Sequence, residues 1–524
     1  MKLRTIVKIA ITSSVVLLCS GFALYSFFRL SAAEGQKDFN LYELVPSTTS
    51  AVFVTDDVLE FVAEVDELTC SKNQQYLYVS KLFSYLKQSL YALSEDTPHG
   101  LSRQMNQMLI SFHEPDNERN QVLYCRLGNG DKELVNRFVR KYISSLYPPK
   151  TFIYKGEEMI IYPMADGDFL ACYLTSDFMA LSFQKKLIEN VIDAYKSGKS
   201  LADDSTFTGI RAPKKSAAAA TIYTRMQGMM GWTEFDMKMK DDFIYFSGIT
   251  HDADTCFAFI NQLRQQQSVK GFPGEVLPST AFYFSRQGIT DWVSLLSYGN
   301  AQGQSVPART SEVQNRDKEF SRYLMENAGQ DLVACLFQRE DTLQDAAAVL
   351  SLSVADVTEA ERMLRALVNA APADEGRRNP RITFCYTVNK AYPIYRLPQT
   401  TLFEQLTSFA EPTLDVYAAF YGGRLLLAPD ADALAHYIRQ LDKGEVLNGA
   451  MAYQTGMDHL SDCYHFMLMA DFDHIFQQSE NHVRFVPDFF LRNADFFRHF
   501  TFFVQFACAD GVVYPNIVLK YKSE

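Results

Sequence analysis

The sequence predicts an α+β protein with two tandem repeats of a mostly antiparallel sheet with packed helices, preceded by one N-terminal transmembrane helix. The first observation is a repeated stretch: residues 43–48 read ELVPST, residues 275–280 read EVLPST, and each precedes a short apolar run typical of a strand. The second is a hairpin and helix pattern that ends at a glycine in both halves. The third is a run without charged residues at 9–28.

Residues 9–28 are predicted to be an uncleaved signal anchor. As a helix they extend about 30 Å, which matches the hydrocarbon thickness of a bilayer. Three basic residues precede the run and one arginine follows it closely, so residues 1–8 are expected in the cytoplasm. A cleaved signal peptide with a small-residue site at 31–33 is the alternative. We therefore expect a single-pass protein of the cell inner membrane, with residues 29–40 as a tether and the bulk of the chain in the periplasm.

Unit 1 is expected over residues 41–267 and unit 2, an internal duplication of it, over residues 268–524. The first part of unit 1 is predicted to be strand, helix, strand, strand, helix and strand, at residues 51–54, 82–93, 107–112, 121–127, 131–147 and 151–154. Unit 2 repeats this order, with strands at 281–284, 331–337, 346–354 and 383–386 and a helix at 356–370. The order β-α-β-β-α-β is that of the split β-α-β in ferredoxin-like folds, which we expect in each unit.

The second part of each unit is predicted to be a hairpin, a helix, a strand and a closing hairpin. Each helix stops at a glycine, Gly198 or Gly444, as a left-handed C-cap requires. The hairpins are expected at 168–183 and 233–249 in unit 1 and at 415–429 and 501–521 in unit 2, with strands at 217–223 and 463–469.

Composition excludes one class of partner. The net charge of -12 and the pI near 5.4 have the wrong sign for a protein that neutralises phosphates, so no nucleic acid is expected. The nine cysteines form no C-x-x-C pair, most lie inside apolar runs, and none falls on another when the repeats are aligned. Buried free thiols are therefore expected rather than a disulfide framework.

Three passages together resemble a known family. They are VPST at residues 45–48, GKSLADD followed by a phenylalanine at 198–207, and WTEFD at 232–236. They are similar to bacterial membrane-anchored envelope proteins with the domain of unknown function 3352, which typically have one N-terminal membrane segment. The resemblance implies a location and an architecture. It assigns no catalytic residues.

Histidine, cysteine and acidic side chains are frequent near the C-terminus, and such groups ligate zinc when four converge. Unit 1 has KKSA at the corresponding place, residues 214–217, and the stretch lacks a compact ligand set. The sequence therefore predicts no catalytic, cofactor-binding or metal site and no cofactor. It offers only weak metal candidates: His459, Cys463, His465 and His474.

Nine phenylalanines lie between Phe485 and Phe506. A hydrophobic core is the main interpretation, because phenylalanine buries a large area. An apolar cleft or patch that binds a lipid, a peptide or a membrane surface is the alternative.

The enzyme motifs Gly-x-Ser-x-Gly, His-Glu-x-x-His and Gly-x-Gly-x-x-Gly are missing from the sequence. The expected function is a non-catalytic binding or scaffold module of the cell envelope. Its expected partners are the membrane, through residues 9–28, and other envelope proteins or an apolar ligand. The alternatives are an envelope hydrolase whose site is not visible as a motif, and a carrier of an apolar ligand.

Overall fold

The structure is a computed structural model of the chain. It describes the following residues: 39–72, 105–114, 119–128, 131–138, 147–164, 167–211, 218–225, 231–250, 258–290, 292, 295, 310–339, 346–370, 381–388, 390–407, 415–478, 486 and 488–522. The anchor predicted at 9–28 and the helix predicted at 82–93 lie outside these ranges. Within them, no helix is long and apolar enough to cross a membrane.

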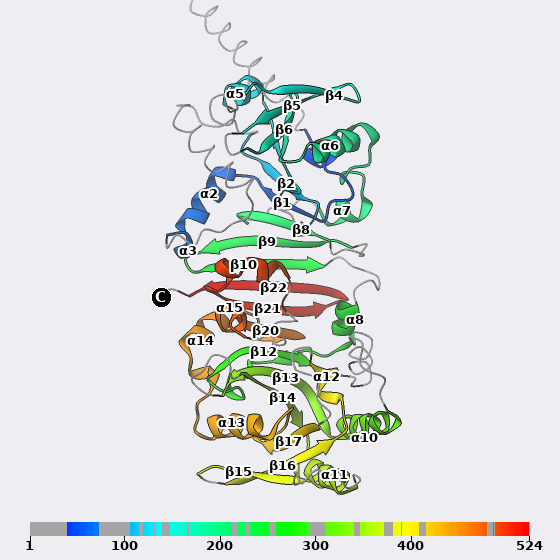
Figure 1. The fold of residues 1–524 in the computed structure, drawn as a ribbon, viewed down its shortest axis with the longest axis vertical. Helices are drawn as coiled ribbons and strands as arrows, with labels where there is room; N and C mark the ends of the chain where they lie inside the picture. The colour runs from blue at the N-terminus through cyan, green and yellow to red at the C-terminus, as the bar shows by residue number, and fades with distance from the viewer. Residues whose placement is uncertain are drawn as a thin grey trace, which may run out of the picture.

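The described chain folds as an α+β structure around one 20-stranded antiparallel sheet, and β11 (Val269–Lys270) with β19 (Cys463–Tyr464) forms a second sheet of two strands. The neighbours in the large sheet follow the order β4-β5-β6-β7-β3-β2-β1-β8-β9-β10-β22-β21-β20-β12-β13-β14-β18-β17-β16-β15. The strands labelled in Figure 1 follow this order from top to bottom, with helices along both sides.

The first half of the sheet contains the strands β1 (Ala51–Thr55), β2 (Met108–Phe112), β3 (Gln121–Arg126), β4 (Lys150–Tyr154), β5 (Glu157–Pro163), β6 (Phe169–Leu174), β7 (Phe178–Ser182), β8 (Ala220–Thr224), β9 (Thr233–Lys240) and β10 (Phe243–Thr250). The second half contains β12 (Ala281–Gly288), β13 (Ala328–Gln338), β14 (Ala346–Val354), β15 (Ile382–Tyr386), β16 (Ala391–Pro398), β17 (Asp415–Tyr421), β18 (Arg424–Ala428), β20 (Phe466–Asp471), β21 (Phe500–Ala509) and β22 (Val512–Tyr521).

The predicted fold class is wrong in its division into two sheets. The closing strands of the two halves, β10 and β22, pair edge to edge, and this pairing joins all twenty strands. Ser247 lies opposite Asn516 in this joint, and its hydroxyl donates a hydrogen bond of 3.0 Å to the Asn516 side-chain oxygen. The pairing satisfies backbone groups that two separate sheets would leave exposed at their edges.

The predicted ferredoxin-like motif is also wrong. A split β-α-β places another strand between the two strands that its helix joins. Here β1 and β2 are direct antiparallel neighbours, although α2 lies between them in the chain. Strand β4 lies at the edge of the sheet beside β5, far from β1 in the strand order.

Strand order is the same in both halves. Reading from the outer edge to the joint, β4-β5-β6-β7-β3-β2-β1-β8-β9-β10 corresponds to β15-β16-β17-β18-β14-β13-β12-β20-β21-β22. In both halves the Pro-Ser-Thr turn forms a bridge to the segment after a helix, Pro46 with Ser200 and Pro278 with Val446. Positions in one half can therefore be matched to positions in the other.

Helices cover the sheet and supply its apolar contacts. Those of the first half are α2 (Val58–Glu67), α3 (Thr69–Lys72), α5 (Asp131–Phe138), α6 (Lys185–Ser197) and α7 (Ser205–Ile210). Between the halves and in the second half lie α8 (Ala258–Gln265), α10 (Ser311–Asn327), α11 (Val357–Ala370), α12 (Leu402–Leu406), α13 (Ala431–Asp442), α14 (Met451–Met457), α15 (Phe472–Phe476), α17 (Asp488–Arg492) and α18 (Ala494–Phe497). The described residues also form the 3-10 turns η1 (Leu41–Leu44), η3 (Pro273–Glu275) and η4 (Leu447–Gly449).

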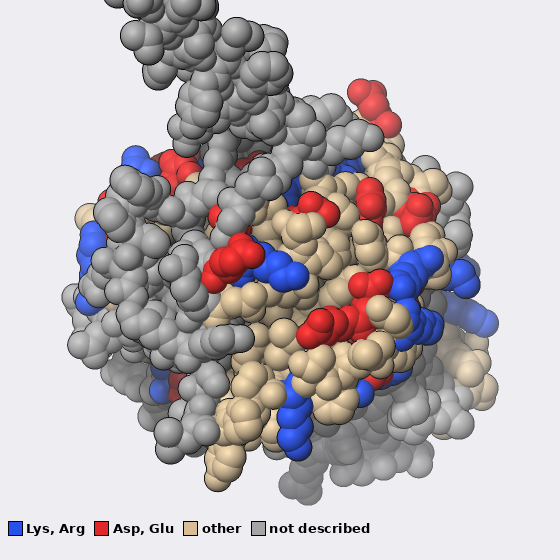
Figure 2. Space-filling view, turned by 90° about the horizontal axis from the view of Figure 1, so that it is seen from above, with Lys and Arg blue, Asp and Glu red and all other residues tan. Residues whose placement is uncertain are grey.

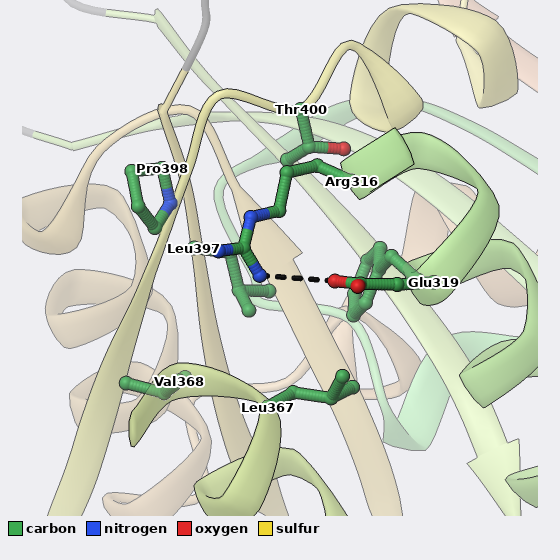
Figure 3. A pocket seen from close by; sticks show the side chains of 8 residues that line it. Arg316, Glu319, Leu367, Val368, Leu397, Pro398 and Thr400 are labelled. Carbon is green, nitrogen blue, oxygen red and sulfur yellow. Dashed lines mark hydrogen bonds and ion pairs between the residues drawn. The ribbon is translucent and has the colours of Figure 1, made fainter. Parts of the chain in front are cut away.

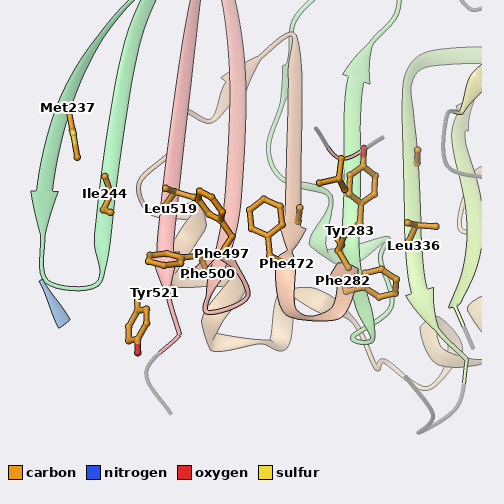
Figure 4. Close-up of a cluster of buried hydrophobic side chains, with 14 of the residues drawn as sticks. Met237, Ile244, Phe282, Tyr283, Leu336, Phe472, Phe497, Phe500, Leu519 and Tyr521 are labelled. Carbon is orange, nitrogen blue, oxygen red and sulfur yellow. The ribbon is translucent and has the colours of Figure 1, made fainter. Parts of the chain in front are cut away.

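The largest buried apolar cluster runs across the joint between the halves. Ile244 of β10 and Leu519 of β22 both belong to it, and so do residues of the outer strands on each side. Figure 4 shows the cluster as a row of side chains from Met237 to Leu336. The core therefore gives the two halves a shared source of hydrophobic stabilisation.

Charged side chains are mixed rather than segregated on the end of the molecule that is seen from above. Figure 2 shows Lys and Arg interspersed with Asp and Glu on the described part of this face.

Candidate functional site

A cavity of about 200 Å³ lies in the second half. Its walls come from the Pro-Ser-Thr turn, β12, β20, β21, α14 and α15. The lining residues are Ser279, Thr280, Ala281, Phe282, Gln338, Leu447, Ala450, Ala452, Tyr453, Met469, Asp471, His474, Thr501 and Phe503. One part of the wall is apolar and another carries hydroxyl, carboxylate and imidazole groups, which is the composition of a small-molecule site.

Besides Tyr453, the titratable residues of this wall are Asp471 and His474. Asp471 ends β20 and caps α15, where its Oδ1 accepts a hydrogen bond of 3.0 Å from the backbone N–H of Asp473. The same Oδ1 lies 2.6 Å from Nζ of Lys522, and Oδ2 lies 3.3 Å from Nδ1 of His474. The His474 ring stacks on the Phe282 ring with 5.9 Å between centroids. These contacts fix both side chains against the cavity.

The neighbours of Asp471 and His474 keep the charged form of each favourable. Burial alone would raise the pKa of the Asp471 carboxyl, but the contacts with His474 and Lys522 outweigh burial and lower that pKa. The facing Asp471 carboxylate raises the pKa of His474, against the smaller opposing effects of burial and of Lys522.

The same place in the first half can be located from the closing hairpins. Lys240 and Ala509 are the last residues before the two turns, and the strands that follow pair with them in the same way. Counting back along β9 and β21 places Trp232 of the first half where Thr501 lies in the second. Strands β8 and β20 pair with β9 and β21 in the same register, so Arg225 matches Asp471.

The first half fills this place with its own side chains. Trp232 is only 1% exposed, and the guanidinium carbon of Arg225 lies 4.9 Å from the centre of its ring. One guanidinium nitrogen of Arg225 donates hydrogen bonds of 2.8 Å to the Ser47 carbonyl and 3.3 Å to the Thr49 carbonyl. Its other terminal nitrogen lies 3.7 Å from a carboxylate oxygen of Asp204.

The cavity exists because the second half has smaller groups at these positions. Thr501 replaces the indole of Trp232, and Asp471 replaces the long side chain of Arg225. Matching from the two Pro bridges places Ala450 at the position of Asp204. Interiors are normally close-packed, so a hollow of this size at a position that the other half fills marks the place as a candidate site.

The four weak metal candidates do not meet at one point. His474 is in the cavity wall, and Nδ1 of His465 accepts a hydrogen bond of 3.1 Å from the backbone N–H of Cys508. His459 contacts the rings of Phe243 and Tyr245, and Cys463 is exposed in β19. In the described ranges no group of three or more His, Cys, Asp or Glu side chains is placed to hold a metal.

The cysteines and the C-terminal phenylalanines have structural roles in the described chain. The seven cysteines described are free, and five of them are buried. Phenylalanines of α15, α17, α18 and β21 pack against one another around Phe472, in stacked, tilted and edge-to-face pairs, with ring centroids 5.0 Å apart for Phe472 and Phe490. This packing fits the core interpretation of the phenylalanine-rich stretch. Among the described phenylalanines of that stretch, Phe503 is the one that lines the cavity.

A second hollow lies between α10, α11 and the end of β16, and Figure 3 shows its lining. Its volume is about 30 Å³, roughly the room that one water molecule needs. Arg316 and Glu319, which both line it, form an ion pair of 2.9 Å. We assign it no ligand.

Sequence reasoning missed Thr501 and Asp471 as site residues. The signal was present in the repeat itself: WTEFD at 232–236 aligns with TFFVQ at 501–505 once the register of the hairpins is known. The predicted hairpins start at residues 233 and 501, whereas the strand pairing matches Trp232 with Thr501. The correspondence between the bulky and the small residue was therefore not noticed.

Comparison with protein-family models, with curated proteins and with solved structures finds no match. The resemblance to the envelope family therefore stays an expectation, and the functional argument depends on the fold and the cavity.

Proposed function

We propose that this chain is a non-catalytic binding protein of the cell envelope and that the second-half cavity is its ligand site. The observation that carries the proposal is the pair of positions at which Trp232 and Arg225 fill the first half while Thr501 and Asp471 leave space in the second. The side chains of the first half occupy this place, whereas the second half has room for a small molecule.

The walls of the cavity support binding of one small ligand. A volume of about 200 Å³ exceeds that of an engineered apolar cavity that takes up benzene, so it admits a ring with a short polar substituent. Hydroxyl and carboxylate groups at one side would orient such a ligand, and the apolar wall would exclude water from its ring.

We also propose a location at the inner membrane with the folded part in the periplasm. The support is the charge-free run at 9–28 and the basic residues before it. In this setting the folded part is held near the membrane and has access to other envelope proteins.

An envelope hydrolase is the second candidate, and one observation favours it: Asp471 and His474 resemble the orienting acid and the base of an acyl-transfer site. That chemistry needs a nucleophile in contact with the base. Among the described residues, no serine or threonine hydroxyl hydrogen-bonds to the His474 ring. The binding function is therefore the better fit.

Mass spectrometry of the purified protein tests the proposed function. The full-length chain is isolated from membranes of its native host, denatured, and the released small molecules are identified. We expect a compound in stoichiometric amount from the wild type and from Thr501→Ser, which keeps the space. Thr501→Trp, which fills it, should release none. Equal release from all three proteins, or none from the wild type, would refute the function.

A further inference from the structure

We propose that the ligand is a small aromatic amine, with its charged nitrogen at Asp471 and its ring in the space that Trp232 occupies in the first half. This inference rests on the proposed function and names the ligand class of the same cavity. The first half serves as a template, because it holds a cation and an aromatic ring together at the matching place.

Hydrogen-bond acceptors surround the position of the nitrogen. In the first half, Arg225 donates to the carbonyls of Ser47 and Thr49. Their matches from the Pro bridges, Ser279 and Ala281, both line the cavity, and no arginine stands beside them there. A ligand that supplies an ammonium group would donate to these acceptors as Arg225 does, and charge-assisted hydrogen bonds of this kind are strong.

Asp471, at the position of Arg225, adds a negative charge that attracts the ammonium group of the ligand. Lys522 holds its Oδ1 at 2.6 Å and is not among the residues that line the cavity, whereas Oδ2 faces His474 at 3.3 Å. A carboxylate can accept about four hydrogen bonds, so Asp471 retains capacity for an ammonium group. When His474 is neutral, Asp471 is the one charged side chain in the described wall of the cavity.

Aromatic and thioether groups surround the position of the ring. Phe282, which stacks on His474, and Phe503 of β21 line the cavity together with Met469. Aromatic pairs and sulfur–aromatic contacts favour a flat ring over a branched aliphatic group of the same size. The small side chain of Thr501 leaves this volume open.

His474 makes the binding depend on pH. The charged groups that face it are Asp471, Asp473 and Lys522. When His474 is protonated, its charge and that of Lys522 oppose a cationic ligand. When His474 loses its proton, its part of the repulsion disappears and only that of Lys522 remains. Amine affinity is therefore expected to increase as the pH is raised through the pKa of His474.

Isothermal titration calorimetry on the full-length protein in detergent tests the inference with two probes of similar shape, phenethylamine and hydrocinnamate. The amine should bind the wild type at least about tenfold more tightly than the carboxylate. Asp471→Asn should weaken amine binding by a similar factor, and Thr501→Trp should abolish it. Tighter binding of the carboxylate, or no binding of the amine, would overturn the inference.

A second variant keeps the test valid if Asp471→Asn does not fold. His474→Gln leaves the carboxylate in place and removes the titrating group. Its affinity for phenethylamine should no longer change between mildly acidic and mildly basic pH, whereas that of the wild type should rise. An identical pH profile in both proteins would contradict the role of His474. If native protein releases a non-amine from the cavity, this inference fails while the proposed binding function stands.

Discussion

At the scale of single residues, Asp331 is a buried carboxylate with two arginine partners. Nε of Arg286 lies 3.0 Å from its Oδ2, and a terminal guanidinium nitrogen of Arg424 lies 3.3 Å from its Oδ1. Nε of Arg424 also donates a hydrogen bond of 2.6 Å to the Ser351 hydroxyl. One carboxylate thus holds two arginines from β12 and β18 in the sheet.

Asp331→Ala should destabilise the protein strongly, because it leaves two largely buried guanidinium groups close together without their anion. Loss of one partner of such a buried network costs about 3 to 5 kcal/mol. Chemical denaturation measures the change. The control is Glu359→Ala, which removes the exposed pair with Arg362 and should have little effect. Equal effects of the two substitutions would show that burial of the network is unimportant.

Asp331 should also contribute to the dependence of stability on pH. Burial would raise the pKa of its carboxyl, but Arg424, Ser353 and Arg286 outweigh burial and lower it. Its contribution is therefore present above the ordinary carboxyl pKa of about 4 and is lost as the pH falls through the lowered pKa. Between about pH 5 and pH 2, the wild type should lose more stability than Asp331→Asn does. Parallel curves for the two proteins would contradict this assignment.

At the scale of single elements, local patterns predicted most strands and helices of both halves. The glycine stops are confirmed: Gly198 and Gly444 have φ values of 62° and 75°. Strand β16 was missed because Pro393 interrupts its apolar pattern, and a proline normally argues against an interior strand. Helix α10 was missed because most of its residues are polar.

Gly444→Ala tests the left-handed stop. An added Cβ would meet no atom within 4 Å, so the cost comes only from the backbone conformation, about 1 to 2 kcal/mol. Gly209→Ala in α7 is the matched control, because it also has open space but ordinary helical geometry. It should stabilise by about 0.4 to 1 kcal/mol. Thermal unfolding of both variants measures these changes in stability. Equal shifts of the two unfolding temperatures would contradict the account of the cap.

At the scale of the whole molecule, the joint between β10 and β22 could not be predicted from local patterns. Both strands were predicted, but pairing between strands so far apart in sequence depends on the folded arrangement of both halves. The cavity could not be predicted for the same reason, since its walls come from segments between Ser279 and Phe503. The repeat predicted which positions to compare, and only the register showed that Trp232 and Thr501 correspond.

The continuous sheet and core predict that the two halves unfold together. The chain has two tryptophans, and the buried Trp232 and Trp292 report on different halves. Trp232→Phe and Trp292→Phe therefore leave one fluorescent probe each. After correction for the stability of each variant by circular dichroism, both probes should give the same midpoint in denaturant. Two separate midpoints would show that the joint does not couple the halves.

The most direct test of the central claim is a crystal structure of the protein purified from its native membrane. We expect electron density that the chain does not account for, in contact with Asp471 and next to Thr501, and no such density beside Trp232 in the first half. Side chains of the second half closed over that space, as Arg225 and Trp232 close the first, would contradict the account.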